Sequence, residues 1–299
     1  MDRLSSLASV SATRAVLERH GLYTKHELGQ NFLINDDVIK KIVALAELAE
    51  RDYVLEVGPG IGTLTEALLK SAGRVVAIER DYDLPAVLAQ TLAPWADRFA
   101  LVNKDALDMS AEDLAAPDGA LPTKFVSNLP YAVAATVVLE VLERIDCIQS
   151  ATVMVQKEVA DRMCAVPGNK NYGAYTVKLG MYARPAGRFA VSPGNFFPPP
   201  HVESAVLRLD RATPVDDAGA PLAPELVAAT CTMADAAFTN RRKTIANSCK
   251  AYFTSKNDAQ AVAAMPAVFE AAGIDARRRG ETLSQAEFIA LARAYLAAR

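Results

Sequence analysis

Short apolar segments alternate with helical patterns over the first half of the 299-residue chain. Each segment has the length and composition of a buried strand and is followed by a polar or glycine-containing loop. Strands that alternate with helices at this spacing form a parallel sheet with right-handed crossovers. We therefore expect an α/β fold with a Rossmann-like doubly wound sheet, in which a ligand binds at the carboxyl ends of the strands. The expected strands cover residues 53–57, 75–79, 99–103, 125–127 and 151–156.

The two ends of the chain have different patterns. Residues 1–28 are polar with a short helical pattern at 13–20, and residues 35–49 begin with an Asn/Asp cap and repeat apolar residues at helical spacing. Residues 211–223 contain acidic residues, glycine and prolines, which marks a linker. Beyond it the chain is rich in alanine, and we expect helices near 224–238, 241–252, 258–272 and 284–297.

Between the sheet and the linker the pattern is less regular. A helix is expected to start at Lys157, and two further strands are expected at 175–182 and 205–209. They bracket a loop, residues 192–200, whose three consecutive prolines should exclude regular structure and leave a stiff extended segment. We expect four parts in all: an N-terminal extension over 1–28, the α/β domain over 29–210, a linker over 211–223 and a small all-α domain over 224–299.

Composition limits the class of protein. With 51% hydrophobic and 22% charged residues the chain can bury a full core, and we expect a soluble globular protein. The formal net charge of −3 gives no overall attraction to nucleic acid, so an RNA surface would have to be a local patch. Residues 211–299 carry 11 Lys or Arg against 9 Asp or Glu, a mild excess of positive charge.

Cysteine usage and hydropathy indicate the compartment. The 4 cysteines form no CxxC pair and have no short spacing to a histidine, so we expect neither a metal site nor a disulfide framework. The N-terminus has no apolar core of signal-peptide length, and no apolar run is long enough to span a membrane. We therefore expect a cytoplasmic protein with reduced thiols and no membrane partner.

A glycine-rich loop follows the first expected strand. Gly58, Gly60 and Gly62 would let the backbone approach a ligand closely, and Glu79, at the end of the next strand, can hydrogen-bond a ribose diol. These features also resemble a dinucleotide-binding fingerprint. A nicotinamide-dependent dehydrogenase is therefore one alternative, and a plain tight turn is another.

Further details favour S-adenosylmethionine over a dinucleotide. The third glycine comes at the fourth position after Gly58 rather than the fifth. Glu56 precedes the loop, where a negative charge would repel a pyrophosphate but suit a cationic sulfonium that carries an amino acid tail. Asp105, just after the third strand, can accept a hydrogen bond from the amino group of a cofactor adenine.

Ser127-Asn128-Leu129-Pro130-Tyr131, at the end of the fourth strand, has the composition of a loop that holds a planar amine. The Asn128 side chain and the Leu129 carbonyl can both accept hydrogen bonds from one NH₂ group, and Pro130 would fix the direction of that carbonyl. Tyr131 can stack on the ring that carries the amine. A turn containing Asn and Pro is the simpler interpretation of the same residues.

Motifs spread over nearly the whole chain carry a family resemblance. They are Gly29–Leu33, Glu56–Gly60, Ile78–Asp81, Lys104–Ala106, Asn128–Tyr131, Gln156–Val159, Phe196–Ser204 and Asn240–Thr244. In these motifs the chain resembles the small-subunit (16S) ribosomal RNA adenine N6,N6-dimethyltransferases, the KsgA/RsmA family, which share their catalytic domain with resistance methylases acting on large-subunit RNA. The last motif is similar to the ribosomal enzymes rather than to the resistance methylases. The N-terminal extension is longer than this family leads us to expect.

The resemblance implies an S-adenosylmethionine-dependent methyltransferase domain and a helical RNA-recognition domain. The enzyme would transfer methyl groups to N6 of two adjacent adenosines in a loop near the 3′ end of small-subunit rRNA, during maturation of the small ribosomal subunit. Its partners would be that subunit and its rRNA, and we expect a monomer. The target base would turn out of its stack and lie between Tyr131 and Phe196, which join Asn128, Leu129 and Pro130 as catalytic residues. By resemblance the cofactor would contact Asn31, Leu33, Gly58, Glu79, Asp105 and Asn128. We also expect contacts with Glu56 and Gly60, in and before the glycine-rich loop.

Two basic clusters lie in the helical part, Arg241-Arg242-Lys243 and Arg277-Arg278-Arg279. They could contact RNA phosphates, or they could be solvated helix faces.

Two other functions also fit the sequence: a ribosome assembly factor without catalytic activity, and a methyltransferase that modifies another RNA or a protein amide.

Overall fold

The computed structural model describes residues 3–24, 30–216 and 219–299. Gly29, the first residue of the Gly29–Leu33 motif, lies outside them. The chain divides into two compact units, one made of Met1–Ala160 and Pro185–Arg211 and the other of Asp161–Arg184 and Ala212–Arg299. The structure thus groups residues 161–184, which we expected within the α/β domain, with the C-terminal helices.

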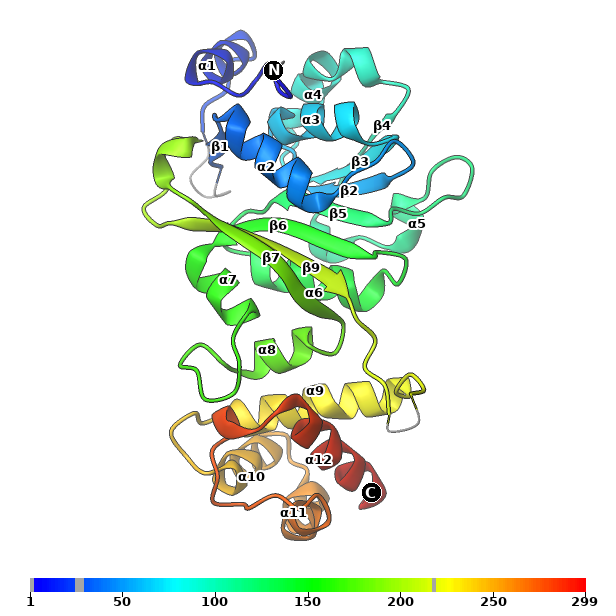
Figure 1. Cartoon of the computed structure of the whole chain (residues 1–299), viewed down its shortest axis with the longest axis vertical. Helices are drawn as coiled ribbons and strands as arrows, with labels where there is room; N and C mark the ends of the chain where they lie inside the picture. Colours follow the sequence, from blue (N-terminus) through cyan, green and yellow to red (C-terminus); the bar gives the residue numbers. More distant parts are fainter. Residues whose placement is uncertain (1–2, 25–29, 217–218) are drawn as a thin grey trace. The chain divides into compact units, whose positions relative to one another are not determined.

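A mixed sheet of seven strands forms the centre of the first unit (Figure 1). Its first five strands along the chain are parallel, as the alternation of strands and helices predicts. The antiparallel strand β9 extends this sheet beside β6. In spatial order the strands are β4 (Phe99–Asn103), β3 (Arg74–Glu79), β2 (Tyr53–Val57), β5 (Lys124–Asn128), β6 (Ser150–Gln156), β9 (Ser204–Arg211) and β7 (Ala183–Val191).

The strand order reverses between β2 and β5. From β2 the chain proceeds to β3 and β4 on one side, and it then returns to form β5 on the other side of β2. At such a reversal the loops that leave the two strands diverge and open a crevice. All five residues of β2 are buried, so both faces of this strand are covered.

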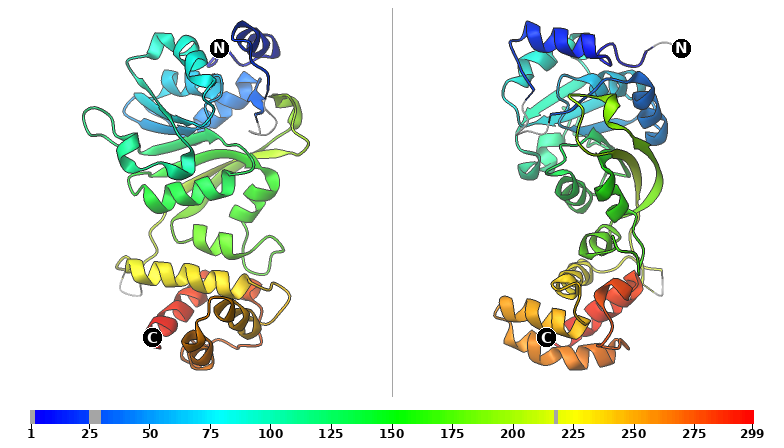
Figure 2. Two further views of the ribbon diagram at one scale, coloured as in Figure 1. Left: turned by 180° about the vertical axis from the view of Figure 1, so that it is seen from behind. Right: turned by 90° about the vertical axis from the view of Figure 1, so that its left-hand side faces the viewer.

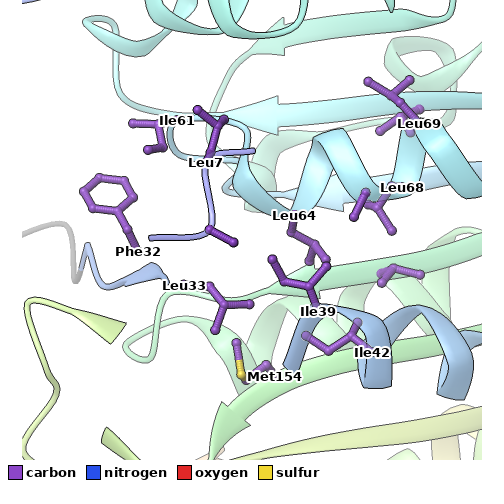
Figure 3. Close-up of a cluster of buried hydrophobic side chains, with 14 of the residues drawn as sticks. Leu7, Phe32, Leu33, Ile39, Ile42, Ile61, Leu64, Leu68, Leu69 and Met154 are labelled. Atoms are coloured by element: carbon purple, nitrogen blue, oxygen red, sulfur yellow. The ribbon is translucent and has the colours of Figure 1, made fainter. Parts of the chain in front are cut away.

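Helices α2 (Asp36–Ala46) and α3 (Thr63–Ser71) pack against each other and against the sheet. The Asn35 side chain caps α2 by accepting the Asp37 N–H, as the Asn/Asp signal predicts. Figure 3 shows Ile39 and Ile42 of α2 facing Leu64 and Leu68 of α3 in the core of this unit. The other helices of the unit include α4 (Leu84–Thr91), α5 (Ala111–Leu114), α6 (Ala134–Arg144) and the start of α7 (Lys157–Met163).

The N-terminal extension is attached to this unit. Its helix α1 (Val10–Arg19) contributes Val16 and Leu17 to the hydrophobic core. Before α1, the backbone N–H and the side chain of Ser6 both donate to Glu66 of α3, at 2.8 and 2.9 Å. The extension is therefore part of the packed structure between residues 3 and 24.

One predicted strand is wrong. Residues 175–182 contain Tyr, Thr and Val, which favour strands, but the structure has helix α8 (Ala174–Leu179) there. Tyr172 and Val177 pack into the core of the helical unit, so the tertiary contacts override the local preference. The strand of this region, β7, comes later, at Ala183–Val191.

The loop at 192–200 is more regular than we expected. A short 3₁₀ turn, Pro193–Asn195, leads into β8 (Phe196–Phe197), which pairs antiparallel with β1 (Phe32–Leu33). The prediction of no regular structure is therefore wrong up to Phe197. It holds from Pro198 onwards, where the three prolines begin.

The second unit is helical. Helix α9 (Pro224–Phe238), yellow in Figure 2, contacts α8, α10 (Ile245–Ser255) and α12 (Gln285–Ala297), and α11 (Ala259–Ala271) packs on α10 and α12. The helix expected at 241–252 begins only at Ile245, because the Thr244 side chain caps it by accepting the Asn247 N–H. Among the described residues, no helix combines the length and the apolar character that a membrane span requires.

Candidate active site

The glycine loop after β2 has the backbone conformation that only glycine adopts readily. Gly58, Gly60 and Gly62 have φ angles of 72°, 59° and 90°. A Cβ on Gly60 would lie 3.0 Å from the Phe32 ring, and one on Gly58 would lie 3.4 Å from Pro130. The glycine loop after β2 therefore packs closely against the Asn128–Tyr131 loop after β5.

These two loops enclose a cavity of about 180 Å³ at the carboxyl ends of β2, β3 and β5. The structure brings together residues that lie far apart in the sequence, and every residue that we expected to contact the cofactor lines this cavity. So do four of the five expected catalytic residues. The set is Asn31, Leu33, Glu56, Gly58, Gly60, Glu79, Asp105, Asn128, Leu129, Pro130 and Tyr131.

The Glu56 side chain is the most unusual polar group in the wall. It is 1% exposed, and its Oε2 has no hydrogen-bond partner in the part of the chain that the structure describes. Burial, together with the nearby charge of Glu79, raises the pKa of Glu56 from 4.5 to about 8. The raised pKa favours the protonated, uncharged form of Glu56 when no ligand cation is bound. The expectation that a charge on Glu56 repels a pyrophosphate is weaker for that reason.

The other two acidic residues of the wall are held by hydrogen bonds. Glu79 accepts the backbone N–H groups of Asp81 at 2.8 Å and of Gly60 at 3.4 Å, and burial raises its pKa. Asp105 accepts the Leu107 N–H at 3.0 Å and forms an ion pair with Arg80 at 3.2 Å. Both carboxylates are therefore fixed in direction at the rim of the cavity.

The cavity fits a polar ligand that brings its own hydrogen-bonding groups. Besides Glu56 Oε2, the buried Thr63 Oγ1 in the cavity wall has no partner among the described residues. The acceptors that line the cavity include the carboxylates of Glu79 and Asp105, which suit a ligand with hydroxyl and amino groups. The glycine loop permits close backbone approach at the same place.

The Asn128–Tyr131 loop is held by hydrogen bonds on both sides. Asn128 Nδ2 donates to the Asn31 carbonyl at 3.2 Å, an orientation that leaves Oδ1 as an acceptor. The Leu129 N–H donates to the Met154 carbonyl at 3.1 Å. Sequence reasoning assigned no role to Ser127, but its Oγ donates to the Val57 carbonyl at 2.5 Å, directly before Gly58. Ser127 therefore ties the start of one loop to the start of the other.

A second hollow of about 210 Å³ shares part of its lining with this cavity. Tyr131, Gln30 and Asn31 line both spaces. The second hollow has flat and amide-bearing side chains that suit a planar heterocycle. Its other lining residues are Gln156, Pro198, Pro199, Pro200, His201 and Val202.

Phe196, the fifth expected catalytic residue, does not line either space. Its side chain is 2% exposed and belongs to the hydrophobic core, because β8 pairs with β1 and places Phe196 opposite Leu33. The expectation that Phe196 offers a stacking face to a base therefore does not describe this conformation. The next residue, Phe197, lies under the Arg14 guanidinium of α1, at 5.0 Å from the ring centroid.

The two basic clusters of the helical unit are neighbours in space. The Ile245 N–H at the start of α10 donates to the Arg278 carbonyl at 2.7 Å, which joins the two segments. Arg241 and Arg278 have structural roles: Arg241 donates to the Tyr172 carbonyl and pairs with Glu281.

Arg278 pairs with Glu287 and donates to the Thr282 carbonyl. Arg277 pairs with Asp275. Three exposed cations, Arg242, Lys243 and Arg279, have no ion pair or hydrogen bond of the side chain within the described ranges. We call these three residues the basic corner.

Comparison with known proteins identifies the family. A family model described as ribosomal RNA adenine dimethylase matches residues 21–291. The chain belongs to this family. It is therefore an rRNA adenine dimethyltransferase, and S-adenosylmethionine is its methyl donor, as the sequence predicted.

Named relatives of this family are similar to the chain over almost its full length. A protein of Streptomyces griseus subsp. griseus, named ribosomal RNA small subunit methyltransferase A, is 42% identical over 301 residues, which cover 97% of this chain and 95% of the relative. A protein of the same name from Clostridium acetobutylicum is 37% identical over 276 residues, covering 92% and 95%.

Solved structures show the same fold. A dimethyladenosine transferase from Plasmodium falciparum has a TM-score of 0.71 at 21% identity and covers 87% of this chain and 95% of its own. The 23S rRNA methyltransferase ErmE has a TM-score of 0.62 at 24% identity and covers 88% and 99%. The Rossmann-like fold class that the sequence predicts is confirmed.

Proposed function

We propose that the enzyme dimethylates N6 of two adjacent adenosines in a loop near the 3′ end of small-subunit rRNA, and that it acts in the cytoplasm, as a monomer, on the maturing small ribosomal subunit. The observation that carries the proposal is the cavity that joins the Gly58 loop, Glu79 and Asp105 to the Asn128–Tyr131 loop. The names of the full-length relatives support the small-subunit substrate.

In this proposal the acidic residues of the wall hold and orient the cofactor. S-adenosylmethionine supplies an activated methyl group on a sulfonium. Glu79 would accept hydrogen bonds from the ribose hydroxyls and Asp105 from the adenine amino group, since protein hydrogen bonds already fix the direction of both carboxylates. Glu56 lies beside the glycine loop, where a ligand cation would favour its ionised form and lower its raised pKa. Asn31 and Leu33 complete the wall.

Asn128 and Leu129 hold the target amine. N6 of adenine is a weak nucleophile because its lone pair is delocalised into the ring. Hydrogen bonds from its N–H groups to Asn128 Oδ1 and to the Leu129 carbonyl favour a pyramidal nitrogen and aim its lone pair at the methyl group. Pro130 and the bond from the Leu129 N–H to Met154 keep this carbonyl in place.

The second hollow receives the target base. A base in a stacked loop cannot reach the cavity, so it must turn out, as other base-modifying enzymes require. Tyr131 stacks on one face of the base, and residues 198–202 line the same hollow. Phe196 takes part only if β8 separates from β1, because its ring is otherwise in the core.

The basic corner contacts phosphates of the RNA. Its three cations have no acidic partner among the described residues that would compete with phosphate, in contrast to Arg241 and Arg278. The other three basic residues of the two clusters, Arg241, Arg277 and Arg278, form ion pairs within the helical unit.

The test is transfer of labelled methyl groups to small subunits from a strain that lacks these methylations, with free rRNA in parallel. We expect up to four methyl groups per subunit, on two neighbouring adenosines mapped by mass spectrometry. Asn128→Ala should abolish transfer while cofactor binding survives in part. Transfer to another position, or full turnover by Asn128→Ala, would contradict the proposal.

A further inference from the structure

Tyr131 carries a polar group that stacking does not use. Its Oη lies 2.6 Å from Ser204 Oγ, so the two hydroxyls share a hydrogen bond. Ser204 is the first residue of β9, and its side chain is fully buried, at 0% exposed. Phenylalanine would stack equally well, so the hydroxyl indicates a second requirement at this position.

Ser204 stands at a rigid point of the sheet. It pairs with Gln156 across the β6–β9 ladder. The carbonyl of the preceding residue, Glu203, accepts the Lys157 N–H at 2.9 Å, and the Glu203 and Lys157 side chains form an ion pair at 2.7 Å. These contacts fix the backbone that carries Ser204 Oγ.

The hydrogen bond links two elements that border the second hollow. Tyr131 belongs to the loop after β5, and Ser204 follows the segment 198–202, which also lines this hollow. A tyrosine ring can swing about the Cα–Cβ bond, and a partner fixed at Oη holds the far end of the ring in one place, because Oη lies on the axis of the second side-chain bond. Burial raises the pKa of the Tyr131 phenol, and the hydrogen bond with Ser204 opposes this rise.

We propose that Ser204 is a positioning residue for methyl transfer: it holds the Tyr131 ring in the place from which the ring presents the N6 edge of the target adenine to Asn128. The inference rests on the proposed function. Ser204 itself touches neither the base nor the cofactor, since it lines neither space. Its effect is therefore on the geometry of the base and not on binding of the cofactor.

The experiment is a double-mutant cycle with Ser204→Ala, Tyr131→Phe and the combined variant. Methyl transfer to unmethylated small subunits gives kcat and KM, and calorimetry gives the dissociation constant for S-adenosylmethionine. We expect each single variant to lower kcat by about tenfold, the rate equivalent of one net hydrogen bond. The double variant should be no slower than either single one, and cofactor affinity should stay within twofold.

Tyr82→Phe is the matched control, because it removes the hydroxyl of a tyrosine that is 80% exposed. It should leave kcat unchanged. If Ser204→Ala folds poorly, Tyr131→Phe breaks the same bond from the half-buried side.

Effects that multiply in the double variant, or cofactor affinity that falls in step with kcat, would overturn the inference. Full activity of both single variants beside an active wild type would overturn this inference alone. A wild type without transfer would overturn the proposed function as well.

Discussion

Glu56→Gln tests the electrostatics of the cofactor cavity directly. The buried carboxyl has no partner at Oε2 among the described residues, and its pKa is raised from 4.5 to about 8. A rise of that size means that the surroundings of Glu56 in the folded protein, burial above all, favour the protonated form by roughly 5 kcal/mol. Glutamine has nearly the same shape and no charge, so it removes this cost without leaving a hole.

The sign of the effect follows from proton binding. Below pH 4.5 Glu56 is protonated in both the folded and the unfolded chain, and it adds no pH dependence. Between the two pKa values the folded protein holds a proton that the unfolded chain releases, so stability falls by about 1.4 kcal/mol per pH unit as pH rises. Above about pH 8 the full cost is present.

The assay is urea unfolding of wild type and Glu56→Gln without cofactor, at pH 5, 6, 7 and 7.5. We expect the variant to gain about 3 kcal/mol relative to wild type between pH 5 and pH 7.5. Glu50→Gln, at an exposed glutamate of the same unit, should show no such trend. A stability difference between wild type and Glu56→Gln that is constant with pH would refute the reasoning.

Three further predictions concern the loops and the helical unit. Ser127→Ala should lower the unfolding free energy by about 1 kcal/mol and weaken cofactor binding, because the Val57 carbonyl loses its donor; unchanged calorimetric affinity would argue against a tie between the two loops. Gly60→Ala should cost more stability in thermal unfolding than Gly119→Ala, since both have positive φ but only Gly60 faces a ring at 3.0 Å; equal losses would refute the close approach. Replacing the three cations of the basic corner by alanine should weaken subunit binding and reduce its salt slope by about 0.7–0.9 for each RNA phosphate that the protein no longer neutralises. An unchanged slope would exclude the corner as a phosphate surface.

The parts of the site that the sequence predicts are those that have a backbone signature. Gly58, Gly60 and Gly62 adopt positive φ, and the strands around them are apolar and short. Because the carboxyl ends of parallel strands share one edge, Glu79, Asp105 and Asn128 could be brought together from their positions after successive strands. The structure places all three in one wall.

What the sequence does not predict depends on contacts between distant segments. Residues 175–182 favour a strand locally, and only packing of Tyr172 and Val177 with the C-terminal helices selects a helix. The family resemblance implies that Phe196 stacks on the base, but in the structure its pairing with Leu33 buries it. The roles of Ser127 and Ser204 depend on partners 70 and 73 residues away, and a serine carries no signal for such a partner.

The helical unit is built from two separate pieces of chain, residues 161–184 and 212–299. A truncation at the linker would therefore not release an autonomous domain. The C-terminal fragment would lack α8, whose Val177, with Tyr172 just before it, fills its core, and the remaining fragment would expose the same side chains to water. A chimera of two related enzymes should therefore take residues 161–184 and 212–299 from the same parent. A single crossover point after residue 211 would combine side chains from different parents in one hydrophobic core.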